Sequence, residues 1–189
     1  MEYINISHKQ DHVSKVHAVS SEQHEAFSVF NVLREQGHWC SRKSDENIPE
    51  YIVLDFHNAV NINYIEMTAS PNGAATFPRD IRFEGSLDGD SWMVIHSEKK
   101  LVLDSDTYRI DVPLTMLRYL KILVISSQQN EGKYYSEIGR VRTGIAGVRE
   151  IRASSTSSPS RGPENLFTEK AESFWESEPK THSVKETLF

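Results

Sequence analysis

The stretch FEGSLDGDSWMVIHSEK, Phe83–Lys99, reads as a strand, a tight turn and a second strand. Asp88-Gly89 lies at the turn, where a hairpin needs a positive φ that glycine adopts at low cost. Trp92 follows directly, and a packed indole ring buries about 150–250 Å² of surface. The stretch therefore predicts a hairpin in which Asp88, Gly89 and Trp92 serve structure rather than chemistry.

The same organisation recurs along the chain from Tyr51 onward. Short runs with an apolar period of two are predicted as strands: Tyr51–Phe56, Ile62–Thr68, Ile81–Gly85, Met93–Ser97, Tyr108–Val112 and Leu117–Ser126. Turn-forming residues separate them at Pro71–Gly73, Asp88–Asp90 and Asp104–Asp106. A helical pattern is nearly absent, since Phe27 to Arg34 allows only about two turns of helix, or a loop with one turn. The pattern indicates an all-β sandwich or barrel.

Composition excludes several classes of protein. The chain has 189 residues and a formal net charge of −6, without the clustered Lys and Arg that nucleic-acid binding requires. Its apolar runs are strand-sized, far below the ~20 residues of a transmembrane helix, and the N-terminus lacks the apolar core of a secretory signal. The single cysteine, Cys40, forbids an internal disulfide and slightly favours a reducing compartment such as the cytoplasm, although the sequence leaves localisation open.

The C-terminal part repeats features of the N-terminal part. Ser154-Ser155 precedes Asn165 at the same spacing by which Ser20-Ser21 precedes Asn31, and a tryptophan follows in both places, Trp175 and Trp39, displaced by two residues between them. We therefore expect one domain over residues 1–147, and a linker with the truncated start of a second repeat over residues 148–189. Because the repeat is too short to bury its own aromatic residues, it should dock on the first domain or pair with another copy in a homo-oligomer.

The ordered motifs resemble one family, the discoidin domain, also called the coagulation factor V/VIII type C domain, in the galactose-binding-like superfamily. The matching pieces are Ser20-Ser21, Asn31–Leu33, Trp39 with Ser41, Pro49–Phe56, Ile62–Glu66, Phe77–Ser86, Asp88–Trp92, Leu117–Ile122 and Ser136–Val141. The resemblance implies a jelly-roll β-sandwich of about eight antiparallel strands. It also implies that Trp92 fills the core behind the turn, with Trp39 and Tyr119 equally structural.

The resemblance places ligand binding in loops at one end of the sandwich, here residues 36–47, 70–79 and 127–136. Sugar-binding relatives use histidine, arginine, asparagine and an aromatic ring, because planar polar groups fix hydroxyl directions and a ring covers the C–H face. The candidates in these loops are His38, Arg42, Asn72, Arg79, Lys133, Tyr134 and Tyr135. We expect one tyrosine to be buried and the other exposed. Arg79 has an alternative role in pairing with Asp80 or Glu84.

No metal or cofactor is predicted. Many relatives carry an Asp-Gly loop that holds a structural calcium, but residues 34–39 here offer only Glu35 as an anionic ligand. Calcium takes about six to eight oxygen ligands, so a structural calcium is disfavoured. Catalysis is not expected either, because the sequence contains no HExxH, no phosphate-binding glycine loop and no paired cysteines.

Two functions remain open. The first is a non-catalytic module that recognises a carbohydrate, of galactose type, through the loops. The second is a protein–protein interaction module of a larger, intracellular assembly. The disfavoured calcium loop and lone cysteine favour the second, while the polar loops with Tyr134 and Tyr135 favour the first.

Overall fold

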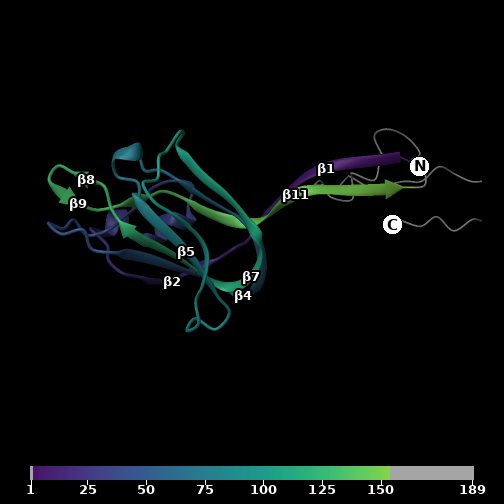
Figure 1. Ribbon diagram of the computed structural model, residues 1–189, viewed down its shortest axis with the longest axis horizontal. Coiled ribbons are helices and arrows are strands. Elements are labelled where there is room, and N and C mark those ends of the chain that lie inside the picture. Colours follow the sequence, from purple (N-terminus) through teal and green to yellow (C-terminus); the bar gives the residue numbers. More distant parts are fainter. Residues whose placement is uncertain (1, 154–189) are drawn as a thin grey trace, which may run out of the picture. The chain divides into compact units, whose positions relative to one another are not determined.

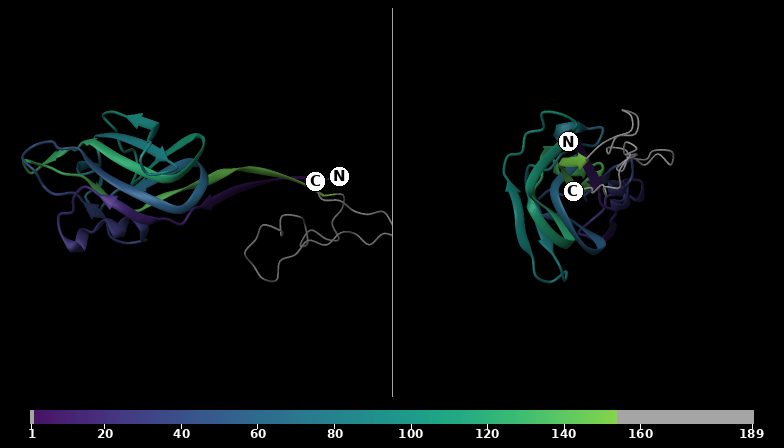
Figure 2. Two further views of the ribbon diagram at one scale, coloured as in Figure 1. Left: turned by 90° about the horizontal axis from the view of Figure 1, so that it is seen from below. Right: turned by 90° about the vertical axis from the view of Figure 1, so that its right-hand side faces the viewer.

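Two long antiparallel strands, β4 (Glu50–Thr68) and β7 (Thr107–Ser126), form the centre of the fold. The computed structural model describes the backbone of residues 2–153 and the side chains of residues 11–147. Each long strand unites two of the predicted short ones. The register between them shifts between Asp55 and Val60 and again between Ile62 and Tyr64, where the strands curve together (Figure 1; Figure 2).

The other strands extend this pair into a seven-stranded sheet, in the order β1-β11-β4-β7-β5-β6, with β2 also paired to β4. Their bounds are β1 Glu2–Asp11, β2 Lys15–Val19, β5 Asp80–Ser86, β6 Met93–Glu98 and β11 Val141–Ala153. Two small sheets complete the described part. β3 (Trp39–Cys40) pairs with β10 (Glu137–Ile138), and β8 (Gln129–Asn130) pairs with β9 (Lys133–Tyr134). The predicted all-β architecture is confirmed.

The chain divides into a main unit, residues 10–145, and a second unit made of residues 1–9 and 146–189. Within the second unit, the parts of β1 and β11 that belong to it lie in neighbouring strands (Figure 1). The predicted second repeat lies outside the described residues, apart from the end of β11. Both the expected boundary at residue 147 and the pairing of the tail with another copy therefore stay predictions.

Alternating side chains build the core of the main unit. Ile52 and Leu54 lie opposite Ile122 and Leu120 in the β4–β7 ladder, and all four are buried. Trp39 is fully buried against them in the same cluster, and its indole Nε1 donates a hydrogen bond to the Ser21 carbonyl over 2.9 Å. The period of two that predicted the strands also selected these core residues.

The hairpin turn has the predicted geometry. Gly89 has a φ of +87°, and Asp88 Oδ1 accepts hydrogen bonds from the backbone N–H groups of Asp90 and Ser91. These N–H groups, followed by the Ser86 hydroxyl, hold the pKa of Asp88 well below its usual range. The turn is therefore fixed by its own side chain, as in an Asx turn.

The expectation that Trp92 fills the core is wrong. Trp92 is only half-buried, and the Lys121 ammonium lies 3.9 Å from its ring centroid. Lys121 pairs with Glu84 across the β5–β7 ladder, on the sheet face opposite to the buried Phe83 and Ile122. Successive residues of a strand point to opposite faces, and the chain emerges from the turn with the indole over the outer face. Tyr119, by contrast, is buried as expected.

Helical structure is confined to short 3₁₀ turns in the described part. Residues Glu25–Phe27 and Val29–Leu33 form two such turns, η1 and η2, and Gly73–Ala75 forms η3. The first two replace the two helical turns that the sequence allowed. Over residues 2–153, no helix has the length and apolar character needed to cross a membrane.

Candidate ligand-binding site

Loops far apart in the sequence meet at one end of the sheet, as predicted. Backbone hydrogen bonds join Ser41 to Ser136, Ser44 to Tyr134, Arg79 to Ser126 and Glu137 to Thr76. We call this region, residues 20–24, 36–49, 70–79 and 127–136, the loop end. The amide of Asn47 closes it further, because Oδ1 accepts from the N–H of Ser127 and Nδ2 donates to the Ser127 carbonyl.

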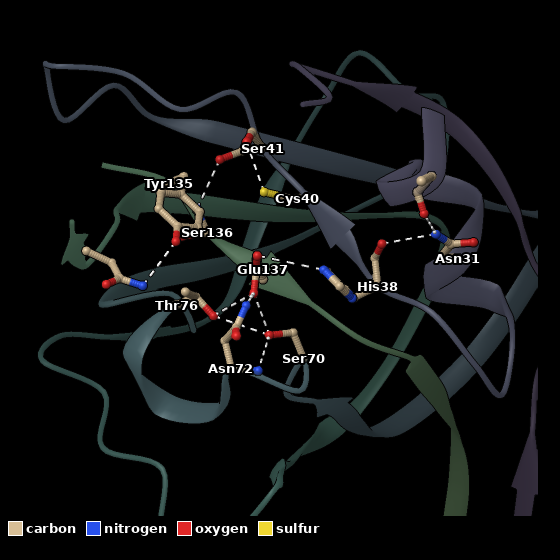
Figure 3. Close-up of polar contacts among 12 residues, drawn as sticks. Asn31, His38, Cys40, Ser41, Ser70, Asn72, Thr76, Tyr135, Ser136 and Glu137 are labelled. Carbon is tan, nitrogen blue, oxygen red and sulfur yellow. Dashed lines mark hydrogen bonds and ion pairs between the residues drawn. The ribbon is translucent and has the colours of Figure 1, made fainter. Parts of the chain in front are cut away.

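A buried carboxylate organises the interior of the loop end. Glu137 is 5% exposed, and its Oε2 accepts hydrogen bonds from Ser70 Oγ, Asn72 Nδ2 and Thr76 Oγ1 over 2.5, 2.9 and 2.8 Å (Figure 3). His38 Nε2 lies 3.7 Å from its other oxygen, Oε1. Of the predicted site residues, His38 faces this carboxylate from the interior, and Asn72, although exposed, donates its side-chain amide to it.

The surroundings of Glu137 have opposing electrostatic effects. Burial favours the protonated acid, but the hydrogen bonds from Ser70, Asn72 and Thr76 and the nearby His38 outweigh it, so the pKa of Glu137 is lowered. For the neighbouring thiol of Cys40, the pKa is raised instead. Burial, and then the negative charge of Glu137, raise the pKa of Cys40 to about 12, so the thiol stays protonated. Cys40 is thus a small buried side chain rather than a nucleophile.

The loop at residues 34–39 does not fit the calcium that relatives hold there. Its one carboxylate, Glu35, pairs with Arg140, and its imidazole, His38, faces Glu137. Across the described side chains, no group of three His, Cys, Asp or Glu residues is arranged to hold a metal ion. Calcium independence remains a prediction. The nearby buried carboxylate, Glu137, already has neutral hydrogen-bond donors and His38 as its partners.

The two tyrosines differ as expected. Tyr135 is buried, its hydroxyl accepts from Asn130 Nδ2 over 3.0 Å, and the Lys43 ammonium lies 4.5 Å from its ring centroid. Tyr134 is half-exposed in β9. Tyr134 is therefore the more exposed ring of the pair.

Two of the predicted cations have carboxylate neighbours. Lys133 Nζ lies 2.6 Å from Asp45 Oδ1. Arg79 is exposed and lies close enough to Asp80 to reinforce the lowering of the Asp80 pKa, which comes first from hydrogen bonds donated by Ser126 and by the Lys100 N–H. The alternative partner Glu84 instead pairs with Arg82 and Lys121.

Arg42 remains as the candidate that faces open space. It is exposed, its guanidinium has no partner among the described side chains, and it lines a groove of about 290 Å³. The groove is also lined by Ser20, Ser21, Lys43, Ser44, Ile48, Pro49 and Glu50. Sequence reasoning did not select these other residues as binding residues, because their meeting depends on how residues 20–21 pack beside residues 42–50.

The family model of the F5/8 type C domain matches residues 15–138. The chain belongs to this family. The match covers the main unit from β2 to β10 and includes all seven predicted site residues. Among curated proteins, no sequence matches the chain significantly.

Solved structures with the same fold include several modules of bacterial enzymes. A fragment of a putative chitobiase from Bacteroides thetaiotaomicron has a TM-score of 0.61 at 16% identity, over 70% of this chain and 88% of that one. CBM32-3, from a family 31 glycoside hydrolase of Clostridium perfringens, also has a TM-score of 0.61, at 15% identity over 69% and 90%. At such identities the likeness establishes the sandwich fold.

Proposed function

We propose that the domain is a non-catalytic carbohydrate-binding module that recognises its ligand with the loop end. The observation that carries this proposal is the groove beside Arg42. It combines serine hydroxyls and the planar guanidinium of Arg42, which match the hydroxyl groups of a sugar, with the apolar surface of Ile48 and Pro49, which matches the C–H face of its ring.

The solved structures of the same fold support a carbohydrate ligand. CBM32-5 of Clostridium perfringens was solved with GalNAc-β-1,3-galactose, with a TM-score of 0.56 at 15% identity over 70% of this chain and 95% of that one. Another, the CBM32 of AlyQ, was solved with 4,5-unsaturated mannuronic acid. These ligands belong to those proteins, and they make galactose-type and acidic sugars the first to test here.

A binding role rather than catalysis is supported by the composition of the groove. Glu50 is its one carboxylate, and both of its oxygens accept hydrogen bonds from serine hydroxyls, those of Ser20 and Ser21. Glycoside hydrolysis by a pair of carboxyl groups needs a second one facing the first across the substrate. The groove has no such pair among its lining residues.

The alternative, a protein-interaction module, is supported by an exposed apolar surface. Leu87, Met93 and Met116 are each more than half exposed and line a separate groove beside the hairpin turn. It lies at the other end of the β5–β7 ladder, because Ser86 pairs with Tyr119 there while Asp80 pairs with Ser126 at the loop end.

A glycan array probed with the full chain, followed by calorimetric titration of the sugars that bind, tests the proposal. We expect binding to a restricted set of glycans, weakened when Arg42 is replaced by alanine. An array without binding, together with capture of a protein partner that the Met93→Asp and Met116→Asp variants abolish, would favour the interaction module.

A further inference from the structure

The accessible charge in the groove is positive. Arg42 is exposed without a partner among the described side chains, and Lys43 lies over the Tyr135 ring without a carboxylate partner. Nearby, the carboxylate of Asp45 is paired with Lys133, and neither Asp45 nor Glu46 lines the groove. The lining of the groove therefore carries two cationic side chains that no described carboxylate pairs with.

The one acidic residue that lines the groove, Glu50, does not neutralise the positive charge of Arg42 and Lys43. Glu50 is only 8% exposed, and its oxygens are held by the hydroxyls of Ser20 and Ser21. Ser21 Oγ also accepts from the Arg42 backbone N–H over 2.9 Å, and Ser20 Oγ accepts from the Tyr51 N–H over 2.8 Å. Glu50 thus stabilises the backbone that forms the groove through Ser20 and Ser21. The carboxylate of Glu50 is already hydrogen-bonded, so it does not favour a basic sugar.

Part of the groove's lining is apolar. Ile48 is 52% exposed and continues into Pro49. We expect a pyranose ring to rest its C–H face on these side chains, within the same groove that Arg42 and Lys43 line. Arginine is suited to a carboxylate there, because its planar fork donates two parallel hydrogen bonds to the two oxygens.

We propose that this groove binds an acidic sugar, whose carboxylate is held by the Arg42 guanidinium and whose charge is further balanced by Lys43. The inference rests on the proposed function and narrows it to a ligand class. A sulfate ester on a sugar presents the same negative, oxygen-rich chemistry, and the experiment separates the two sources.

The test is calorimetric titration of the full chain with digalacturonic acid, galactose 6-sulfate and galactose at low and at physiological ionic strength. We expect digalacturonic acid to bind at least tenfold more tightly than galactose, and its affinity to fall as salt is added. Stronger binding of galactose 6-sulfate than of digalacturonic acid would overturn the assignment to a carboxylate.

Variants identify the residue responsible. Arg42→Ala should reduce affinity for digalacturonic acid at least tenfold and that for galactose by a much smaller factor. Arg42→Lys should recover only part of the loss, because lysine keeps the charge without the fork. Arg34→Ala, an exposed arginine outside the groove, is the matched control and should bind as the wild type does.

The outcomes separate the two proposals. If galactose binds as tightly as digalacturonic acid and Arg42→Ala affects both equally, the acidic-sugar inference is wrong and the carbohydrate function stands. If no sugar on the array or in the titrations binds, the proposed function fails as well. Binding of an oligoglutamate peptide in place of every sugar would assign the two cationic side chains to a protein ligand and overturn both.

Discussion

His38 Nε2 lies 3.7 Å from the carboxylate oxygen Oε1 of the buried Glu137, and this pair connects the loop before β3 to β10. The same carboxylate connects both to the Ser70–Thr76 loop through three hydrogen bonds. Glu137 therefore ties three segments of the loop end together, in addition to the backbone and Asn47 contacts, while the exposed Arg42 is left to recognise a ligand.

Removing the charge of Glu137 should destabilise the fold. Glu137→Gln replaces the charged oxygen that accepts three hydrogen bonds by a neutral amide, which is a weaker acceptor. We therefore expect the free energy of unfolding to fall by about 2–4 kcal/mol. Urea denaturation followed by circular dichroism measures this. Glu131→Gln, at an exposed loop position, is the matched control. Equal stability of the two variants would show that the network does not hold the loop end.

Acid should weaken the domain through Asp55. The pKa of Asp55 is lowered to about 2, first of all by the hydrogen bond from Arg118. Burial opposes this shift, while the His57 N–H and the charge of Lys15 add to it. Because the folded pKa is depressed, this stabilisation is complete above the ordinary carboxyl pKa, about 3.9, and is lost as pH falls from there toward 2.

The corresponding variant is Asp55→Asn. It should lower stability at neutral pH by about 1–3 kcal/mol and reduce the pH dependence of the melting temperature between about pH 4 and pH 2, leaving the part that comes from other carboxyl groups with a lowered pKa, such as Asp88. Asp104→Asn, at an exposed position, should leave the profile unchanged. A wild-type slope that survives in Asp55→Asn would assign the acid sensitivity to other carboxyl groups.

Calcium should not stabilise the domain. A site filled at a calcium concentration 100 times its Kd would add about 2.7 kcal/mol to the free energy of unfolding. We expect identical melting temperatures in EDTA and in millimolar CaCl₂, because His38 and neutral donors surround Glu137. A calcium-dependent rise of the melting temperature that Glu137→Gln removes would contradict this.

The thiol of Cys40 should be inert while the domain is folded. Burial and the neighbouring Glu137 raise its pKa to about 12, so the thiolate that reacts with disulfide reagents is scarce at pH 8. We expect no reaction with DTNB in buffer and one equivalent after addition of guanidinium chloride, since the chain has a single cysteine. Rapid native labelling would show that the β3–β10 region opens readily.

Sequence patterns predicted the strands well because short apolar runs between turn residues are typical of strands. Burial itself alternates less than expected, since the central strand β4 is buried on both faces from Ile52 to Phe56. The position of Trp92 could not be predicted from size and apolarity, since its sheet face depends on the path of the chain through the turn. Likewise, the fusion of short strands into β4 and β7 depends on ladder pairing across their irregularities.

The candidate site was predictable by loop and not by side-chain direction. Arg42 is exposed and Tyr134 is half-exposed, but His38 and Asn72, of equally suitable chemistry, contact Glu137. The sequence contains no local signal for that choice, because Glu137 is far from both in the chain. The groove beside Arg42 likewise forms only when residues 20–21 reach residues 42–50.

The most direct test of the loop end as the recognition surface is a ¹H–¹⁵N NMR titration of the full chain with digalacturonic acid and with galactose. The account predicts shift changes concentrated in residues 20–24 and 36–49, led by Arg42 and Lys43, with the hairpin around Leu87 and Met93 unchanged. Changes centred on that hairpin, with the loop end silent, would contradict it.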